Sequence, residues 1–183
     1  MSSACAHLIN EKYKIVANLP YGISSAFLKM FLTSKCQPQS ITLLLQKEVA
    51  QRICAQPGSM SLLAVSVQLY GNPKIISQVL PESFWPKPKV TSAILQVTQI
   101  RPFPYADQVS EKMYWQMVRS GFSNKRKQLH NNLKNSLHLS AGQAQKILDQ
   151  SGIKASQRAQ ELSLEDWLSL AQSYNQFLVD GSK

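Results

Sequence analysis

Two kinds of apolar pattern follow one another along the first hundred residues of this chain. Short apolar runs predict four strands, at 14–17, 40–45, 73–80 and 92–100. Between them, apolar residues at helical spacing predict three helices, at 24–33, 47–55 and 61–70. Ser24 is the expected N-cap of the first helix. Strands and helices that alternate in this way favour an α/β fold.

A different pattern begins after Pro102 and Pro104, which interrupt the last predicted strand. They mark an expected boundary between a domain at 1–103 and a second domain at 104–183. Beyond the boundary only helical stripes remain, at 110–119, 125–137, 140–150 and 163–178. The second domain is therefore predicted to be small and all-helical, with a core that includes Leu129, Leu133, Leu137, Trp167 and Ala171.

The first predicted strand ends in the sequence Asn18-Leu19-Pro20-Tyr21. Pro20 cannot donate to a strand ladder, so it stops the strand. This leaves a polar amide, a backbone carbonyl and an aromatic ring at the carboxyl end of a strand, which is where open α/β sheets bind ligands.

Methyl transfer to an aromatic amine is a chemistry that suits these groups. The amine lone pair is delocalised into the ring, so two acceptors must hold the N–H groups before it can attack. The Asn18 side-chain oxygen and the carbonyl of Leu19 or Pro20 could supply them, and Tyr21 could stack on the base for about 1–3 kcal/mol. The alternative explanation is a turn that ends the strand with a local Asx hydrogen bond.

A stiff basic segment, Phe84-Trp-Pro-Lys-Pro-Lys-Val-Thr-Ser92, lies between the last two predicted strands. Phe84 is a candidate to stack on the opposite face of the base from Tyr21, since flipped-out bases are held between aromatic or apolar side chains. Lys87 and Lys89 are candidates for contact with RNA phosphates.

A second basic cluster, Lys125-Arg126-Lys127, falls at the start of a predicted helix. Cations are electrostatically disfavoured at a helix N-terminus. This placement therefore favours a phosphate-binding role over that of an ordinary solvated helix start.

Taken together, these motifs make the chain resemble the rRNA adenine dimethyltransferase family. The matching pieces, in the order and at the spacing of the family, are Asn18–Tyr21, Gln46–Ile53, Phe84–Ser92, Gly121–Lys127 and Arg158–Ser163. The resemblance implies a Rossmann-like methyltransferase sheet whose last two strands pair antiparallel, followed by a helical domain. It also implies that two adjacent adenines of small-subunit rRNA are dimethylated with S-adenosyl-L-methionine. The related antibiotic-resistance methyltransferases, which modify large-subunit rRNA, usually carry Ile where this chain has Leu19.

The chain departs from the family pattern in its cofactor-binding motifs. No two of its seven glycines form the Gly-x-Gly of the family's cofactor loop, and Glu11 is the only carboxylate before Asn18. The sequence looks like the family without its first third, so Asn18 is the one cofactor contact expected to remain. We expect poor S-adenosyl-L-methionine binding by this chain alone, and an open sheet edge at Lys14–Asn18 through which it could self-associate.

The overall charge agrees with an RNA partner. The formal net charge is +10 over 183 residues, and a strongly basic balance favours phosphate backbones. Cys5, Cys36 and Cys54 form no Cys-x-x-Cys pair, so neither a zinc site nor a disulfide framework is expected. No apolar stretch is long enough to span a bilayer, and the N-terminus has no basic segment followed by an apolar core, so we expect a cytoplasmic protein without a membrane partner. His7, His130 and His138 form no metal-ligand pattern, and no metal partner is expected. The alternative to an enzyme is a non-catalytic RNA-binding or ribosome-assembly module that has lost its cofactor site.

Overall fold

The computed structural model describes residues 13–181, and it divides into two compact units. Of the described residues, the first unit contains 13–55 together with Leu63–Pro104. The second contains Gln56–Leu62 and 105–181. Cys5, His7 and Glu11 lie outside the described residues.

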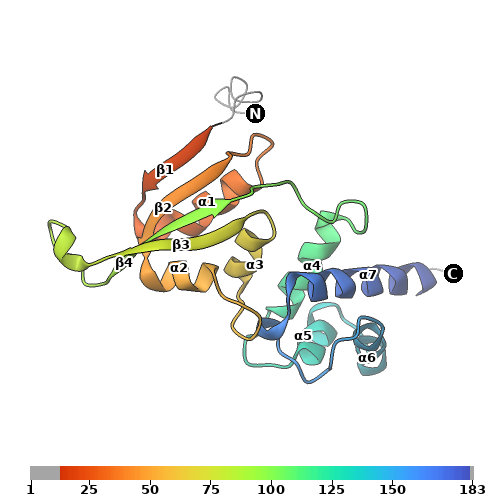
Figure 1. Ribbon diagram of the computed structural model, residues 1–183. Coiled ribbons are helices and arrows are strands. Elements are labelled where there is room, and N and C mark those ends of the chain that lie inside the picture. The colour runs from red at the N-terminus through yellow and green to blue at the C-terminus, as the bar shows by residue number, and fades with distance from the viewer. Residues whose placement is uncertain (1–12, 182–183) are drawn as a thin grey trace. The chain divides into compact units, whose positions relative to one another are not determined.

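A four-stranded sheet organises the first unit (Figure 1). Its strands are β1 (Lys14–Asn18), β2 (Ser40–Gln46), β3 (Asn72–Val79) and β4 (Ser92–Thr98), in the order β1-β2-β4-β3. β1 runs parallel to β2, whereas β4 is antiparallel to both β2 and β3. The expected antiparallel pairing of the last two strands is therefore confirmed.

Strand register gathers several strand ends at one edge of this sheet. Asn18, the last residue of β1, pairs with Leu44, two residues before the end of β2. Ser92, the first residue of β4, pairs with both Gln46 of β2 and Val79 of β3. The carboxyl ends of β1, β2 and β3 thus meet the beginning of β4 at a single edge, which we call the carboxyl edge.

The core of the first unit forms between the sheet and its helices, α1 (Ser24–Leu32), α2 (Lys47–Ile53) and α3 (Leu62–Gln68). Alternate residues of β2 are fully buried, and α2 packs against β2, β3 and β4. Ser24 does not cap α1 as expected. A 3-10 turn, η2 (Tyr21–Ile23), leads straight into the helix, so Ile23 takes the N-cap position and Ser24 is the buried first residue.

β1 is an edge strand of the described sheet, as expected. It pairs with β2 alone among the described strands, and its residues alternate between exposed and half-buried. The Val16 side chain is 81% exposed. An exposed apolar edge strand can pair with another chain or aggregate, and most proteins avoid one.

Four helices build the second unit, α4 (Glu111–Gly121), α5 (Leu129–Ser136), α6 (Ala141–Gln150) and α7 (Leu164–Gly181), with a 3-10 turn, η4 (Ala159–Glu161), before the last. The predicted core is largely confirmed, because Leu129, Leu133, Trp167 and Ala171 are buried, while Leu137 is half-buried. α5 begins at Leu129, four residues later than predicted. Residues 125–127 therefore form a turn before the helix, and their expected place at a helix N-terminus is wrong.

No helix between residues 13 and 181 combines the length and the apolar character needed to cross a membrane.

Candidate functional site

Asn18 ends β1 at the carboxyl edge with an exposed side chain. Within the described residues this amide makes no hydrogen bond, so the local Asx bond of the alternative explanation is not formed. The strand ends because Pro20 follows it, and the exposed amide is left available to a ligand.

The two carbonyls that follow Asn18 differ in their hydrogen bonding. The Pro20 carbonyl accepts the backbone N–H of Ile23 at 3.2 Å, which closes the η2 turn. The Leu19 carbonyl accepts no hydrogen bond from the part of the chain that the structure describes. Leu19 is thus the freer of the two predicted acceptors. The side chain of Tyr21 lies outside what the structure describes.

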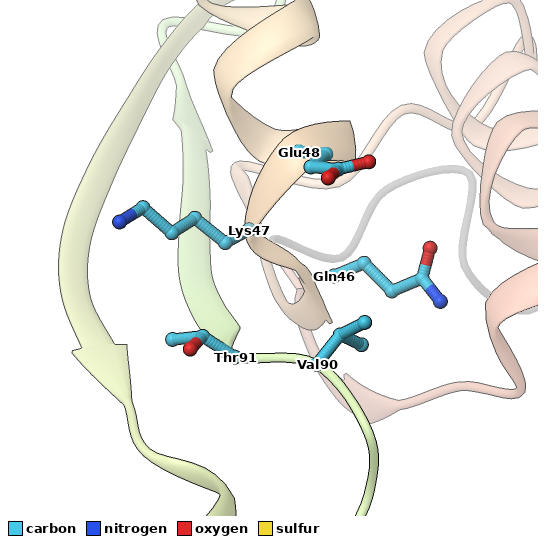
Figure 2. A pocket seen from close by; sticks show the side chains of 5 residues that line it. All are labelled: Gln46, Lys47, Glu48, Val90 and Thr91. Atoms are coloured by element: carbon cyan, nitrogen blue, oxygen red, sulfur yellow. The ribbon is translucent and has the colours of Figure 1, made fainter.

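A shallow pocket lies further along the carboxyl edge, where β2 passes into α2 and the loop from 84–91 enters β4 (Figure 2). It has a volume of about 210 Å³, and its lining residues are Gln46, Lys47, Glu48, Val90 and Thr91. The Lys47 N–H donates to the Thr91 carbonyl at 3.0 Å and fixes the pocket floor. Figure 2 shows the Gln46 amide and the Glu48 carboxylate extending to one side and the Lys47 ammonium to the other.

Phe84 lies directly after the 3-10 turn η3 (Pro81–Ser83) and is half-buried. The two lysines that follow it differ. Lys87 pairs with Glu82 at 2.7 Å, and this hydrogen bond lowers the pKa of the Glu82 carboxyl. Lys89 is exposed and has no ion-pair partner in the described chain. Lys89 is therefore the more available cation of this segment.

Trp85 is a feature of this segment that the sequence analysis did not single out. Its side chain is 96% exposed, more than any other large apolar side chain of the described residues. Neighbours in extended backbone point to opposite sides, and Phe84 is extended. Alternation could have indicated that one of these aromatic rings faces solvent, but the sequence alone did not say which.

The second basic cluster lies on a loop held by two asparagines. The side-chain oxygen of Asn124 accepts the backbone N–H of Arg126 at 3.1 Å, and the backbone carbonyl of Asn124 accepts the N–H of Lys127 at 3.2 Å. The Asn132 amide, which is buried, donates to the carbonyls of Gly121 at 2.6 Å and Asn124 at 2.9 Å. The basic side chains of this loop, Lys125, Arg126 and Lys127, are exposed.

The described residues offer little to hold S-adenosyl-L-methionine. No glycine-rich cradle precedes Asn18 in them, and the pocket at Gln46 is shallow and open. The nearest carboxylate in the sequence after β1 is Glu48, at the start of α2. In addition, no group of three or more His, Cys, Asp or Glu side chains in residues 13–181 is arranged to hold a metal ion.

Comparison with known sequences places these features in context. The family model described as ribosomal RNA adenine dimethylase matches residues 4–176. A ribosomal RNA small subunit methyltransferase A from Dehalococcoides mccartyi is 41% identical over 165 residues, which cover 90% of this chain and 56% of that protein. One from Clostridium botulinum is 39% identical over 159 residues, covering 86% and 57%. The chain thus spans little more than half the length of these relatives.

Solved structures give the same fold. A dimethyladenosine transferase from Plasmodium falciparum superposes with a TM-score of 0.76 at 25% identity, over 91% of this chain and 68% of that one. The 23S rRNA methyltransferase ErmE superposes with a TM-score of 0.67 at 24% identity, over 91% and 66%. The predicted fold class, part of a Rossmann-like methyltransferase sheet followed by a helical region, is confirmed.

Proposed function

Because this chain belongs to the ribosomal RNA adenine dimethylase family, we propose that it carries the base-binding part of a small-subunit rRNA adenine dimethyltransferase. In this proposal two adjacent adenines receive two methyl groups each, and S-adenosyl-L-methionine supplies the methyl groups. The observation that carries the proposal is the exposed, unbonded amide of Asn18 beside the open carbonyl of Leu19.

The role of these two groups follows from the electronic structure of the adenine amine. Its nitrogen is planar and a poor nucleophile while the lone pair is shared with the ring. The Asn18 oxygen accepts one N–H and the Leu19 carbonyl accepts the other, which favours a nitrogen whose lone pair points away from both acceptors. No strong base is required, because the methylated nitrogen carries a positive charge and loses its proton readily.

The aromatic side chains complete the base-binding site in this proposal. Tyr21 stacks on one face of the adenine and Phe84 on the other, each contributing about 1–3 kcal/mol. Pro20 fixes the backbone between Leu19 and Tyr21, since its ring restricts φ. The half-buried position of Phe84 supports a ring that is held in place rather than freely moving.

RNA affinity in this proposal comes from Lys87 and Lys89 in the first unit and from Lys125, Arg126 and Lys127 in the second. All five are exposed and cationic, and cations of this kind neutralise phosphates and release counterions. The partner is small-subunit rRNA or its pre-ribosomal particle. The site of action in this proposal is the cytoplasm.

The described residues do not fit S-adenosyl-L-methionine on their own. Asn18 is the one group at the carboxyl edge that we assign to the cofactor as well as to the base. This mismatch supports the second candidate function, a non-catalytic RNA-binding or ribosome-assembly module. Self-association through the exposed edge of β1 would accompany either function.

Methyl transfer that depends on Asn18 separates the two candidates. Small-subunit particles that lack dimethyladenine are incubated with labelled S-adenosyl-L-methionine and either the unmodified chain or the Asn18→Ala variant. Asn72→Ala is the matched control. Asn72 is also an exposed asparagine of the same sheet, but it is the first residue of β3 and lies at the end of the strands opposite the carboxyl edge. The enzymatic candidate requires label in adenine with the unmodified chain and with Asn72→Ala, and a loss of at least about a hundredfold with Asn18→Ala.

Two results would contradict the enzymatic proposal. Incorporation that survives Asn18→Ala would remove the role given to that amide. Absence of incorporation by a chain that still binds the particles would leave the RNA-binding module as the function of this chain.

A further inference from the structure

The most exposed aromatic side chain of the described structure, Trp85, has no role in the base-binding site described above. It lies on the connection between β3 and β4, which extends away from the sheet in Figure 1. Its side chain is 96% exposed and contacts no other ring within the described residues. A fully solvated indole is unfavourable, and the Leu80 and Val90 side chains of the same connection are also exposed. Exposed apolar groups that gather on one element mark interaction surfaces.

Trp85 is presented on a rigid support. The N–H groups of Ser83 and Phe84 bond to the carbonyls of Leu80 and Pro81 at 3.0 and 3.2 Å and close the η3 turn. The Glu82–Lys87 pair joins the two sides of the segment. Together with the prolines at 81, 86 and 88, these contacts leave little backbone freedom to lose when a ligand binds, which favours affinity.

The charge beside Trp85 selects the class of partner. Lys87 neutralises Glu82, and Lys89 is left as an exposed cation without an ion-pair partner in the described residues. The tip thus combines a flat aromatic face with net positive charge. Bases of single-stranded nucleic acid stack on such a face while their phosphates meet the cation. The bases of a duplex are stacked on one another and unavailable.

We propose that Trp85 is a stacking platform for an unpaired nucleotide of the RNA substrate, separate from the adenine that Asn18 holds, with Lys89 meeting the adjoining phosphate. This inference rests on the proposed function for the identity of its ligand. It adds a contact outside the base-binding site, which would help to select single-stranded over paired RNA.

Tryptophan emission during titration with a short unstructured RNA tests the inference directly. Stacking should quench the exposed indole of the unmodified chain. Trp85→Ala should abolish that change and weaken binding by about five- to hundredfold, with the same slope of log affinity against log salt, because no charge is removed. Trp85→Phe should restore part of the affinity, and Trp115→Phe is the control for a tryptophan in the second unit. Since the Trp85 side chain is 96% exposed, its variants should melt at the temperature of the unmodified chain.

Three outcomes would overturn the inference. One is equal RNA affinity of Trp85→Ala and the unmodified chain. The second is an equal loss of affinity for heparin or for duplex RNA, which would mean that stacking on an unpaired base is not involved. The third is unchanged RNA affinity with lost binding to a ribosomal protein, which would assign the surface to a protein partner. In each case methyl transfer that depends on Asn18 would still uphold the proposed function, because that assay does not measure this contact.

Discussion

Replacing Asn132 by alanine should loosen the loop that carries the second basic cluster. The buried amide of Asn132 uses both of its N–H groups, one on the Gly121 carbonyl and one on the Asn124 carbonyl. Gly121 is the last residue of α4, and the final carbonyls of a helix have no partner within the helix. Asn132 therefore caps α4 and ties the following loop to α5.

The expected cost can be built from these two bonds. The carbonyl of buried Gly121 would lose its partner away from water, which costs roughly 1–3 kcal/mol. The carbonyl of exposed Asn124 can turn to water, so its loss is about 0.5–1.5 kcal/mol. Helix propensity returns about 0.5 kcal/mol when alanine replaces asparagine in a helix. The net expectation is about 1–4 kcal/mol of lost unfolding free energy.

Urea denaturation measures this loss, and Asn135→Ala is the matched control. Asn135 lies on the same helix with an exposed side chain, so its replacement brings the same gain in propensity and removes no tertiary bond. Salt-dependent RNA binding provides a second measurement. Asn132→Ala should weaken binding at every salt concentration without changing the slope, since Lys125, Arg126 and Lys127 keep their charges. Equal stability of the two alanine variants would refute the capping role of Asn132.

Two further predictions concern a close contact and an ion pair. Gly121→Ala should destabilise the chain by about 1–3 kcal/mol or more in thermal or urea unfolding, because the added Cβ would overlap the fully buried ring of Trp167. Gly142→Ala, with nothing within 4 Å of the new Cβ, should instead gain up to about 1 kcal/mol, and equal effects of the two substitutions would contradict the packing argument. Glu82→Gln should leave the melting temperature unchanged, strengthen RNA binding and steepen its salt slope by up to about 0.7, because it releases Lys87. The Glu82 carboxylate is charged at neutral pH, and its hydrogen bond with Lys87 lowers its pKa further. Acidification below that lowered pKa should therefore reproduce the effect in the unmodified chain but not in Glu82→Gln.

Much of the fold follows from local pattern in the sequence. β2 alternates between buried and half-buried residues along its length, and α6 has Ser140 as its N-cap, in a capping box completed by Gln143. In both places the residues that determine the element lie within or beside it. Sequence reasoning is reliable there, because periodicity and capping act over only a few residues.

The errors arise where individual hydrogen bonds, and not apolar periodicity, decide the local conformation. Lys125 to Leu137 has a helical stripe, yet the helix starts only at Leu129, since Asn124 and Asn132 hold the preceding residues in a turn. Pro20 similarly accepts the Ile23 N–H in a 3-10 turn, and this displaces Ser24 from the cap position. Neither arrangement can be read from the periodicity of the apolar residues.

The sequence indicates the candidate site residues only where a local pattern determines their surroundings. Asn18 follows from a strand stopped by Pro20, and the structure indeed leaves its amide exposed and unbonded within the described residues. The pairing of Lys87 with Glu82 and the full exposure of Trp85 depend on how the β3–β4 connection turns. Composition shows a basic segment there, but it does not show which of its charges are already paired.

The segment Gln56–Leu62 has a consequence for how this chain can be made and divided. It interrupts the first unit in sequence but belongs to the second, where the N–H groups of Gly58 and Met60 both donate to the carbonyl of Gln160. During synthesis these two hydrogen bonds cannot form until Gln160, about a hundred residues later in the chain, has left the ribosome. A fragment cut after Pro104 would keep the donors and lose their acceptor, so neither unit can be produced intact by a single cut of the chain.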